Sequence, residues 1–217
     1  MLNKVADLKK QLEFHYQYHC LFYSDIRGHL PVLRTLAQEC SSVVEIGLRG
    51  MVSTWSILQG LSENSAPKPL SYLGIDLAAP FVSLQKLKLI KQIAKAHGIN
   101  FKIWVKNDMQ IELPKTEMLF IDSLHTYCHL TYELEKFSAQ TGKYIVMHDT
   151  SPPWGYADDS AYQGDYSEYP SSFDKKKRGL WPAIEDFLKR HSEWCLHKRY
   201  LNDHGLTILK RKKKLKT

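Results

Sequence analysis

Short apolar runs alternate with amphipathic segments along most of this chain, and this pattern predicts alternating strands and helices. Apolar positions in residues 4–19 recur at roughly helical spacing, and a second helix is predicted from Leu30 to Cys40, with Pro31 in its first turn. The apolar runs that follow are short and bounded by glycine or acidic residues, as expected of buried strands. The predicted strands are 42–46, 70–76, 101–105, 117–122 and 143–148, and the predicted helices between them run to Leu61, from Pro80 to Gly98, and from Thr126 to Ala139.

Strand–helix alternation on this scale predicts an α/β fold. We expect a Rossmann-like, doubly wound sheet that is mostly parallel, with helices on both faces. A helix at 181–189 and two strands at 194–201 and 205–211 predict a C-terminal antiparallel hairpin strand. The predicted organisation is a set of N-terminal helices in 1–41 that pack on or cap one domain, 42–211, and a basic tail, 212–217.

Residues 151–179 carry no periodic pattern. They combine prolines, tyrosines and acidic residues with four consecutive cations, Lys175–Arg178. A long segment without periodicity inside an α/β domain is usually a functional loop. We therefore expect this segment to form a loop beside the site where an acceptor substrate binds.

Polar residues and one glycine lie at or just past the carboxyl ends of the predicted strands. They are Glu45, Gly47, Asp76, Asp108, Asp122, His148 and Asp149. Ligands of open α/β sheets bind outside the carboxyl ends of the strands, near the point where the strand order reverses. The pattern therefore predicts a ligand site at this edge of the sheet.

The segment VVEIGLRG at 43–50 predicts a strand, a glycine-rich turn and the start of a helix. In the dinucleotide fingerprint G-x-G-x-x-G the first position is a glycine, but here it is Glu45. A carboxylate there would repel a pyrophosphate and suits a cationic ligand such as S-adenosylmethionine. Asp76 could accept the ribose hydroxyls, and Asp108 could reach the exocyclic amine of adenine. A tight turn without a ligand is the alternative.

Five segments occur in a characteristic order: residues 24–61, LFIDSLHTYCHLTYELEKF, KYIVMHDT, GLWPAIEDFL and NDHGLTILKR. Together they resemble class I S-adenosylmethionine-dependent O-methyltransferases, in the branch with rhamnosyl and macrolide-sugar O-methyltransferases and cephalosporin-hydroxylase-like proteins. The resemblance spans about residues 24–211. It implies that Asp76 binds the ribose, that Asp108 lies on the adenine side, and that the methionine end of the cofactor is lined by Glu45, Gly47, Arg49, Gly50, Ser53 and Thr54.

Asp122 and His125 follow the fourth predicted strand, and His148 and Asp149 end the fifth. Adjacent parallel strands would bring the two pairs together, and two carboxylates with an imidazole suit Mg²⁺ or Mn²⁺. The resemblance implies that His125 is the base and Asp122 a catalytic ligand, with Asp122, His148 and Asp149 holding the metal. His148 stands where the relatives can carry an acid, so the lost negative charge should weaken Mg²⁺ binding.

Structural roles are the alternatives for these residues. His125 could cap a helix, Asp149 could stabilise a turn, and His148 could support the metal ligands without binding the metal itself. The expected reaction is metal-assisted methylation of a sugar hydroxyl, for example on rhamnose in a glycan. His29 and His204 lie in the resembling segments, so a role on the substrate side is open. The remaining histidines are interpreted as surface or packing residues: His15, His19, His97, His129, His191 and His197.

Charge changes this picture only at the C-terminus. Lys and Arg number 30 against 23 Asp and Glu, for a net charge of +7. Six of those cations lie in residues 210–217, which leaves 24 against 23 elsewhere. A uniformly basic nucleic-acid-binding domain is therefore excluded, and a nucleic-acid partner is not expected.

Two other functions are alternatives for this sequence: a nucleic-acid-associated methyltransferase that uses the tail, and a nicotinamide-dependent oxidoreductase. The segment Ser151–Trp154 resembles a motif of base-methylating enzymes, but here it follows the fifth strand instead of the fourth. Glu45 in the glycine-rich turn argues against a nicotinamide dinucleotide.

No apolar run approaches the roughly 18 residues of a membrane span, and the N-terminus lacks an uninterrupted apolar signal region. Four widely spaced cysteines are predicted to be free thiols: Cys20, Cys40, Cys128 and Cys195. We expect a cytoplasmic protein. The aromatic residues of the first helix favour packing or a homodimer surface: Phe14, Tyr16, Tyr18, Phe22 and Tyr23.

Overall fold

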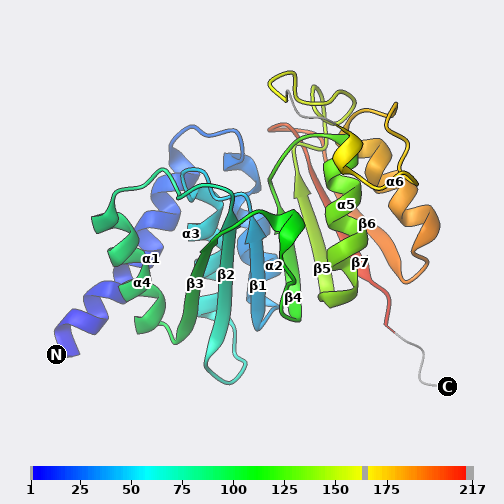
Figure 1. Cartoon of the computed structure of the whole chain (residues 1–217). Coiled ribbons are helices and arrows are strands. Elements are labelled where there is room, and N and C mark those ends of the chain that lie inside the picture. The colour runs from blue at the N-terminus through cyan, green and yellow to red at the C-terminus, as the bar shows by residue number, and fades with distance from the viewer. Residues whose placement is uncertain (1, 163–165, 214–217) are drawn as a thin grey trace.

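The computed structural model of this chain describes residues 2–162 and 166–213. Its centre is a seven-stranded sheet with the order β3-β2-β1-β4-β5-β7-β6 (Figure 1). The strands are β1 Ser42–Ile46, β2 Leu70–Asp76, β3 Ile99–Val105, β4 Thr116–Ile121, β5 Thr141–His148, β6 Trp194–Tyr200 and β7 Leu206–Arg211. Strands β1 to β5 pair in parallel, and β7 pairs antiparallel with both β5 and β6. The predicted Rossmann-like sheet with a C-terminal antiparallel hairpin is confirmed.

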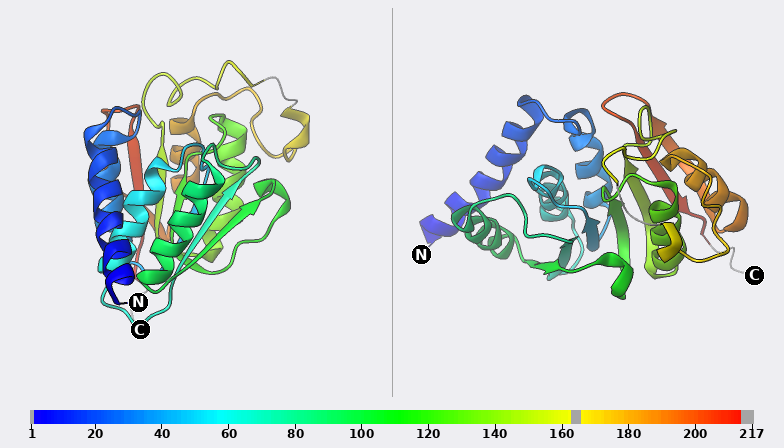
Figure 2. Two further views of the ribbon diagram at one scale, coloured as in Figure 1. Left: turned by 90° about the vertical axis from the view of Figure 1, so that its left-hand side faces the viewer. Right: turned by 45° about the horizontal axis from the view of Figure 1, so that its top comes forward.

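Helices cover both faces of the sheet (Figure 2). They are α1 Leu2–Leu21, α2 Leu30–Gln38, α3 Val52–Glu63, α4 Leu84–Ala96, α5 Tyr127–Phe137 and α6 Leu180–Arg190. One core joins α1 to α4 with one face of the strands, and a second core joins α5 and α6 with the other face. The two cores exist because successive side chains of a strand point to opposite faces.

The alternation along β1 and β5 decides which side each site residue faces. In β1, Val43 packs in the core of α1 to α4, whereas Val44 packs in the core of α5 and α6. In β5, Tyr144 and Val146 belong to the first core and Met147 to the second. The side chain of His148 therefore points toward the side of the sheet that carries the N-terminal helices.

Some predicted helix boundaries differ from the structure. The helix predicted from Pro80 begins at Leu84, because the Ser83 hydroxyl caps it by accepting a hydrogen bond from the Lys86 N–H at 3.1 Å. Thr126, predicted as the first residue of the next helix, is its N-cap and accepts from the His129 N–H at 3.2 Å.

The basic C-terminal segment also begins within the fold. Lys210 and Arg211 close β7, and the Arg211 guanidinium donates to the carbonyls of Thr141 and Ser138 at 2.9 and 2.5 Å. These two cations are part of the folded body and do not belong to a tail. Residues 214–217 of the predicted tail lie outside the described residues.

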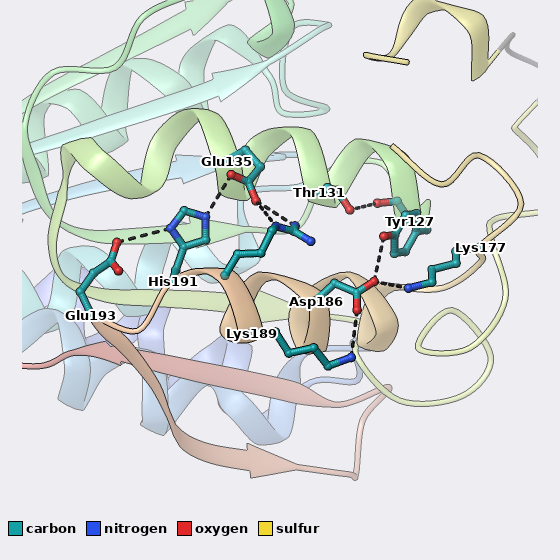
Figure 3. Close-up of polar contacts among 9 residues, drawn as sticks. Tyr127, Thr131, Glu135, Lys177, Asp186, Lys189, His191 and Glu193 are labelled. Carbon is teal, nitrogen blue, oxygen red and sulfur yellow. Dashed lines mark hydrogen bonds and ion pairs between the residues drawn. The ribbon is translucent and has the colours of Figure 1, made fainter. Parts of the chain in front are cut away.

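Polar contacts tie α6 to α5 on one side of the molecule (Figure 3). The Tyr127 hydroxyl donates to Asp186 at 3.0 Å, and the Lys177 ammonium also bonds Asp186. His191 contacts Glu135 at 3.0 Å. The groove beside these contacts has a volume of about 860 Å³. The pairs hold α6 and the end of the 151–179 loop against α5.

The helices described in the structure include none that is both long and apolar enough to cross a bilayer.

Candidate active site

Asp122, His125, His148 and Asp149, here called the strand-end cluster, meet beyond β4 and β5. His125 Nε2 lies 3.0 Å from Asp149 Oδ2 and 3.7 Å from Asp122 Oδ1. His148 Nδ1 lies 3.4 Å from Asp122 Oδ1 and 3.3 Å from Asp149 Oδ2. The parallel pairing of β4 with β5 produces this arrangement, as the positions of the residues along the chain predicted.

The ring of His148 is oriented by a backbone carbonyl. Its Nε2 contacts the Asp203 carbonyl oxygen at 3.0 Å, and because a carbonyl only accepts, Nε2 must carry a hydrogen. In the neutral ring Nδ1 would then present a lone pair to the carboxylates of Asp122 and Asp149. That is unfavourable unless a proton or a metal ion lies at Nδ1. Metal-binding histidines are commonly held in this way, with the other ring nitrogen donating to a carbonyl.

The charges of the cluster shift its pKa values in opposite directions. The two carboxylates raise the pKa of His148 to about 11 and that of His125 to about 9, although burial opposes both shifts. The same imidazoles hold the pKa values of Asp122 and Asp149 below the usual range, again against burial. Without another cation, the cluster at neutral pH consists of two carboxylates and two imidazolium ions.

The donor set of the cluster fits a divalent cation. Asp122, His148 and Asp149 each offer a ligand atom, and these atoms lie within 4.8 Å of one another. His148 Nδ1 and Asp149 Oδ1 are buried without a well-aligned hydrogen bond, and the same holds for His125 Nε2 in spite of its 3.0 Å distance from Asp149 Oδ2. A cavity of about 10 Å³ borders Asp122, His125 and His148, which is about the space of one water molecule. Oxygen and imidazole ligands of this kind suit Mn²⁺ or Mg²⁺.

Residues distant in the sequence complete this region. His204 Nδ1 lies 3.7 Å from Asp149 Oδ1, and Asp159 Oδ2 lies 3.9 Å from His125 Nδ1. The Trp154 ring lies between His125 and His204, with ring centroids 5.0 and 5.2 Å away. Asp149 adopts a left-handed backbone, with φ 58°. A residue without glycine's freedom is rare in that conformation and frequent at functional sites.

The N-terminal segment supports the hairpin turn that carries His204. His29 is fully buried, and its Nε2 donates to the Asn202 carbonyl at 2.9 Å. Gly28 packs closely on the same turn, since a Cβ there would lie 2.0 Å from the Asp203 side-chain oxygen Oδ2. The His29 ring also packs edge-on against His148, with centroids 5.7 Å apart. His29 therefore supports the cluster from inside the fold, and His204 borders it; a role of His204 on the substrate side stays a prediction.

The glycine-rich turn after β1 has the shape expected of a ligand-binding turn. Gly47 has φ 89°, and a Cβ there would lie 1.9 Å from the Asp122 carbonyl oxygen, so the turn packs tightly on the start of the strand-end cluster. A Cβ at Gly50 would meet nothing within 4 Å, so the turn faces open space at this position. A ligand could approach the backbone closely there.

Asp76 anchors the same turn from the end of β2. Its Oδ2 accepts from the Leu48 and Arg49 N–H groups at 2.8 and 3.3 Å, and its Oδ1 accepts from the Ala78 N–H at 3.0 Å. An ionised carboxylate has about four acceptor positions, so Asp76 can still accept a hydrogen bond from a ligand hydroxyl. Its predicted position beside the glycine-rich turn is what the structure shows, and its contact with a ribose stays a prediction.

Glu45 lies beneath the glycine-rich turn and does not reach its surface. The carboxyl group is fully buried and accepts from the hydroxyls of Ser53, Thr54 and Tyr72. Burial raises the pKa of Glu45 to about 7, although these hydrogen bonds lower it. Glu45 and Thr54 therefore support the turn from inside and have no exposed side-chain surface with which to line a cofactor, and Ser53 is nearly buried as well. The Arg49 side chain is exposed and pairs with Asp25 at 3.0 Å.

A second buried cluster, Asp108, His129 and Glu133, lies between the segment after β3 and helix α5. His129 Nε2 lies 2.9 Å from Asp108 Oδ2, and the side chain of Asp108 is 12% exposed. His129, interpreted from the sequence as a surface or packing residue, is therefore the partner of a predicted cofactor residue. The signal that could have found it is the spacing of His129 and Glu133, four residues apart on one helix face.

The fold is that of S-adenosylmethionine-dependent methyltransferases. Similar solved structures include the methyltransferase PaMTH1 of Podospora anserina bound to S-adenosylhomocysteine (12% identity, 93% of this chain and 88% of that one, TM-score 0.54). An O-methyltransferase of Bacillus cereus with the same ligand matches at 12% identity over 94% and 91%, with TM-score 0.54. TomG of Streptomyces achromogenes, an O-methyltransferase of tomaymycin synthesis solved with S-adenosylmethionine, matches at 12% over 93% and 89%, with TM-score 0.53.

The sequence matches no protein-family model and no curated protein.

Proposed function

We propose that this protein is an S-adenosylmethionine-dependent O-methyltransferase that uses a divalent metal ion and methylates a sugar hydroxyl, for example on rhamnose in a glycan. The observation that carries the proposal is the strand-end cluster beside the glycine-rich turn, on a methyltransferase fold. The fold supports the cofactor class. The residues of the strand-end cluster support metal-assisted methyl transfer to a hydroxyl group.

The residues around the glycine-rich turn fit S-adenosylmethionine. The backbone at Gly50 is open to a ligand, Asp76 retains an acceptor position for a ribose hydroxyl, and Asp108 presents a partly exposed carboxylate for the adenine amine. When bound, S-adenosylmethionine supplies an activated methyl group on a sulfonium. The work left to the protein is alignment of the acceptor and removal of its hydroxyl proton.

Asp122, His148 and Asp149 would hold the metal ion, which when bound supplies positive charge that stabilises a developing alkoxide. The Asp203 carbonyl keeps His148 Nδ1 directed at the two carboxylates. This orientation supports His148 as a metal ligand, because its Nδ1 already faces the two carboxylates. The loss of one negative charge still favours Mn²⁺ over Mg²⁺, since imidazole is a poorer ligand for the harder ion.

His125 is the group best placed to take the proton of the acceptor. Its Nε2 lies within the cluster, 3.0 Å from Asp149 Oδ2, and its Nδ1 lies 3.9 Å from Asp159 Oδ2, beyond hydrogen-bond distance. The carboxylates that raise its pKa to about 9 keep it protonated at neutral pH. A cation that neutralises Asp122 and Asp149 removes this cause, so His125 becomes a base only in the loaded site.

The acceptor side is bordered by Trp154 and His204, and the loop after β5 lies over this edge of the sheet (Figure 2). Asp158 fixes the base of that loop by accepting from the N–H groups of Tyr127 and Gly179 at 2.9 and 2.7 Å. Aromatic rings at this edge suit the apolar face of a sugar ring. This feature and the resemblance to rhamnosyl and macrolide-sugar methyltransferases support a sugar acceptor.

Isothermal titration calorimetry with S-adenosylhomocysteine tests the cofactor, and absence of binding would refute the proposal. For the acceptor, labelled S-adenosylmethionine is incubated with a panel of glycans and nucleotide sugars, with Mn²⁺ or with EDTA, and products are identified by mass spectrometry. Methyl transfer that survives both EDTA and Asp149→Ala would remove the metal from the mechanism. Methyl transfer to nucleic acid and to none of the sugars would refute the proposal that the acceptor is a sugar.

A further inference from the structure

Asp108 is held by hydrogen bonds on the side of α5. His129 Nε2 donates to Asp108 Oδ2 at 2.9 Å, because a carboxylate can only accept. The other ring nitrogen, Nδ1, lies 3.0 Å from the Tyr169 hydroxyl. In the neutral tautomer, Tyr169 donates to His129 and His129 donates to Asp108. This relay connects the loop after β5 with the carboxylate predicted to contact adenine.

Glu133 supports the same carboxylate from inside the protein. It is fully buried, and its Oε1 accepts from the Ser123 hydroxyl at 2.7 Å. Its Oε2 has no such partner, and a carboxylate oxygen of Glu133, one of Asp108 and a ring nitrogen of His129 lie within 4.8 Å of one another. Burial raises the pKa of Glu133 well above its usual range. A neutral Glu133 whose Oε2–H donates to Asp108 satisfies every one of these atoms.

We propose that His129, Glu133 and Tyr169 are positioning residues that hold Asp108 as an ionised, oriented acceptor and thereby select a purine with a 6-amino group at the base of the cofactor. The inference rests on the proposed function, since it concerns the nucleoside end of S-adenosylmethionine. It adds the groups that set the specificity of that end.

The selection follows from the number of acceptor positions. The carboxylate of Asp108 has about four acceptor positions. His129 and the Met109 N–H occupy two of them, and a neutral Glu133 would occupy a third. The remaining one accepts from an amine and repels the 6-oxo group of hypoxanthine. A site built to receive a specific N–H discriminates strongly against an analogue that lacks it, because its buried polar group is then left unpaired.

The test compares two ligands by calorimetry: S-adenosylhomocysteine and S-inosylhomocysteine, which differ at the 6-position of the purine. We expect wild type to prefer the adenine ligand, His129→Phe to lower that preference by about tenfold, and Tyr169→Phe by about threefold. Glu133→Gln should keep the preference within about twofold, since its amide N–H can still donate to Asp108. Tyr132→Phe is the matched control, because the Tyr132 hydroxyl bonds the Met109 carbonyl and not the carboxylate.

Equal weakening of both ligands in His129→Phe and Tyr169→Phe would overturn the inference, because a merely structural role changes both alike. Stoichiometric Zn²⁺ in wild type that is lost in His129→Phe would also overturn it, since the three side chains would then be metal ligands. Failure of wild type to bind either ligand would instead refute the proposed function. Thermal melts of each variant establish that it is folded.

Discussion

Glu45 makes the stability of this protein depend on pH in a predictable direction. In the fold its pKa is raised from 4.5 to about 7 by complete burial. Between these two values the folded state binds more protons than the unfolded state, so stability falls as pH rises from about 4.5 to about 7 and is then constant. The full shift corresponds to about 3 kcal/mol, at about 1.4 kcal/mol for each pKa unit.

The perturbation is Glu45→Gln, which keeps the size of the side chain and removes the titration. Between pH 5 and pH 8 the linkage predicts a loss of about 2.5 kcal/mol in wild type from this residue alone. In urea unfolding this is a shift of the midpoint by about 1 M, for a slope of about 2–3 kcal/mol per M. The quantity measured is the difference between the two proteins in their change from pH 5 to pH 8, so that contributions of other groups cancel.

Glu185→Gln is the control, because it removes a carboxylate from an exposed position on α6. It should leave the pH dependence as in wild type. The reasoning is refuted if Glu45→Gln retains the wild-type pH dependence to within about 0.5 kcal/mol, since Glu45 would then ionise in the fold as freely as in the unfolded chain.

Three other predictions concern the turn, the metal and the first helix. Gly47→Ala should lower the free energy of unfolding by roughly 3 kcal/mol or more, because its Cβ would lie 1.9 Å from the Asp122 carbonyl oxygen. Gly50→Ala should fold normally, because its Cβ would meet nothing within 4 Å. It should weaken S-adenosylhomocysteine binding by about tenfold or more in calorimetry. Because the pKa values of His148 and His125 are raised to about 11 and about 9, Mn²⁺ must displace the proton of His148 and also favours loss of the proton of His125. Its affinity should therefore rise at least about tenfold per unit from pH 6 to pH 8 in electron paramagnetic resonance titrations, and His148→Gln should make that slope smaller by about one proton. Leu12→Ala on α1 should cost about 2–5 kcal/mol in chemical denaturation because Leu12 is 0% exposed, while Phe14→Ala, at a residue 64% exposed, should cost under about 0.5 kcal/mol; equal losses would mean that α1 is not docked as described.

The periodic pattern predicted the strands and the positions of the acids with little ambiguity. Asp122 and Asp149 come together because β4 and β5 pair in parallel, and a buried apolar run ending in an acid already indicates such a strand end. The boundary at Ser83 was missed because Pro80 is also a suitable first-turn residue. A local pattern does not decide between two valid start signals.

The partners of these acids could not be predicted from local pattern. The sequence indicates only a surface or packing role for His129, because a lone histidine on an amphipathic helix carries no sign of its partner. Its contact with Asp108 depends on how the segment after β3 crosses to α5. Likewise, the contact of His29 with Asn202 joins residues 173 positions apart in the sequence.

The sequence by itself determined the α/β alternation, the two-sided core and the acids at the strand ends, because these follow from side-chain periodicity within single elements. The tertiary structure alone decided which imidazoles and hydroxyls meet those acids, and that Glu45 lies beneath the turn instead of at its surface. The physical reason is that charge state, burial and hydrogen bonding are properties of groups brought together from different elements. Their energies depend on packing distances that no repeat in the chain records.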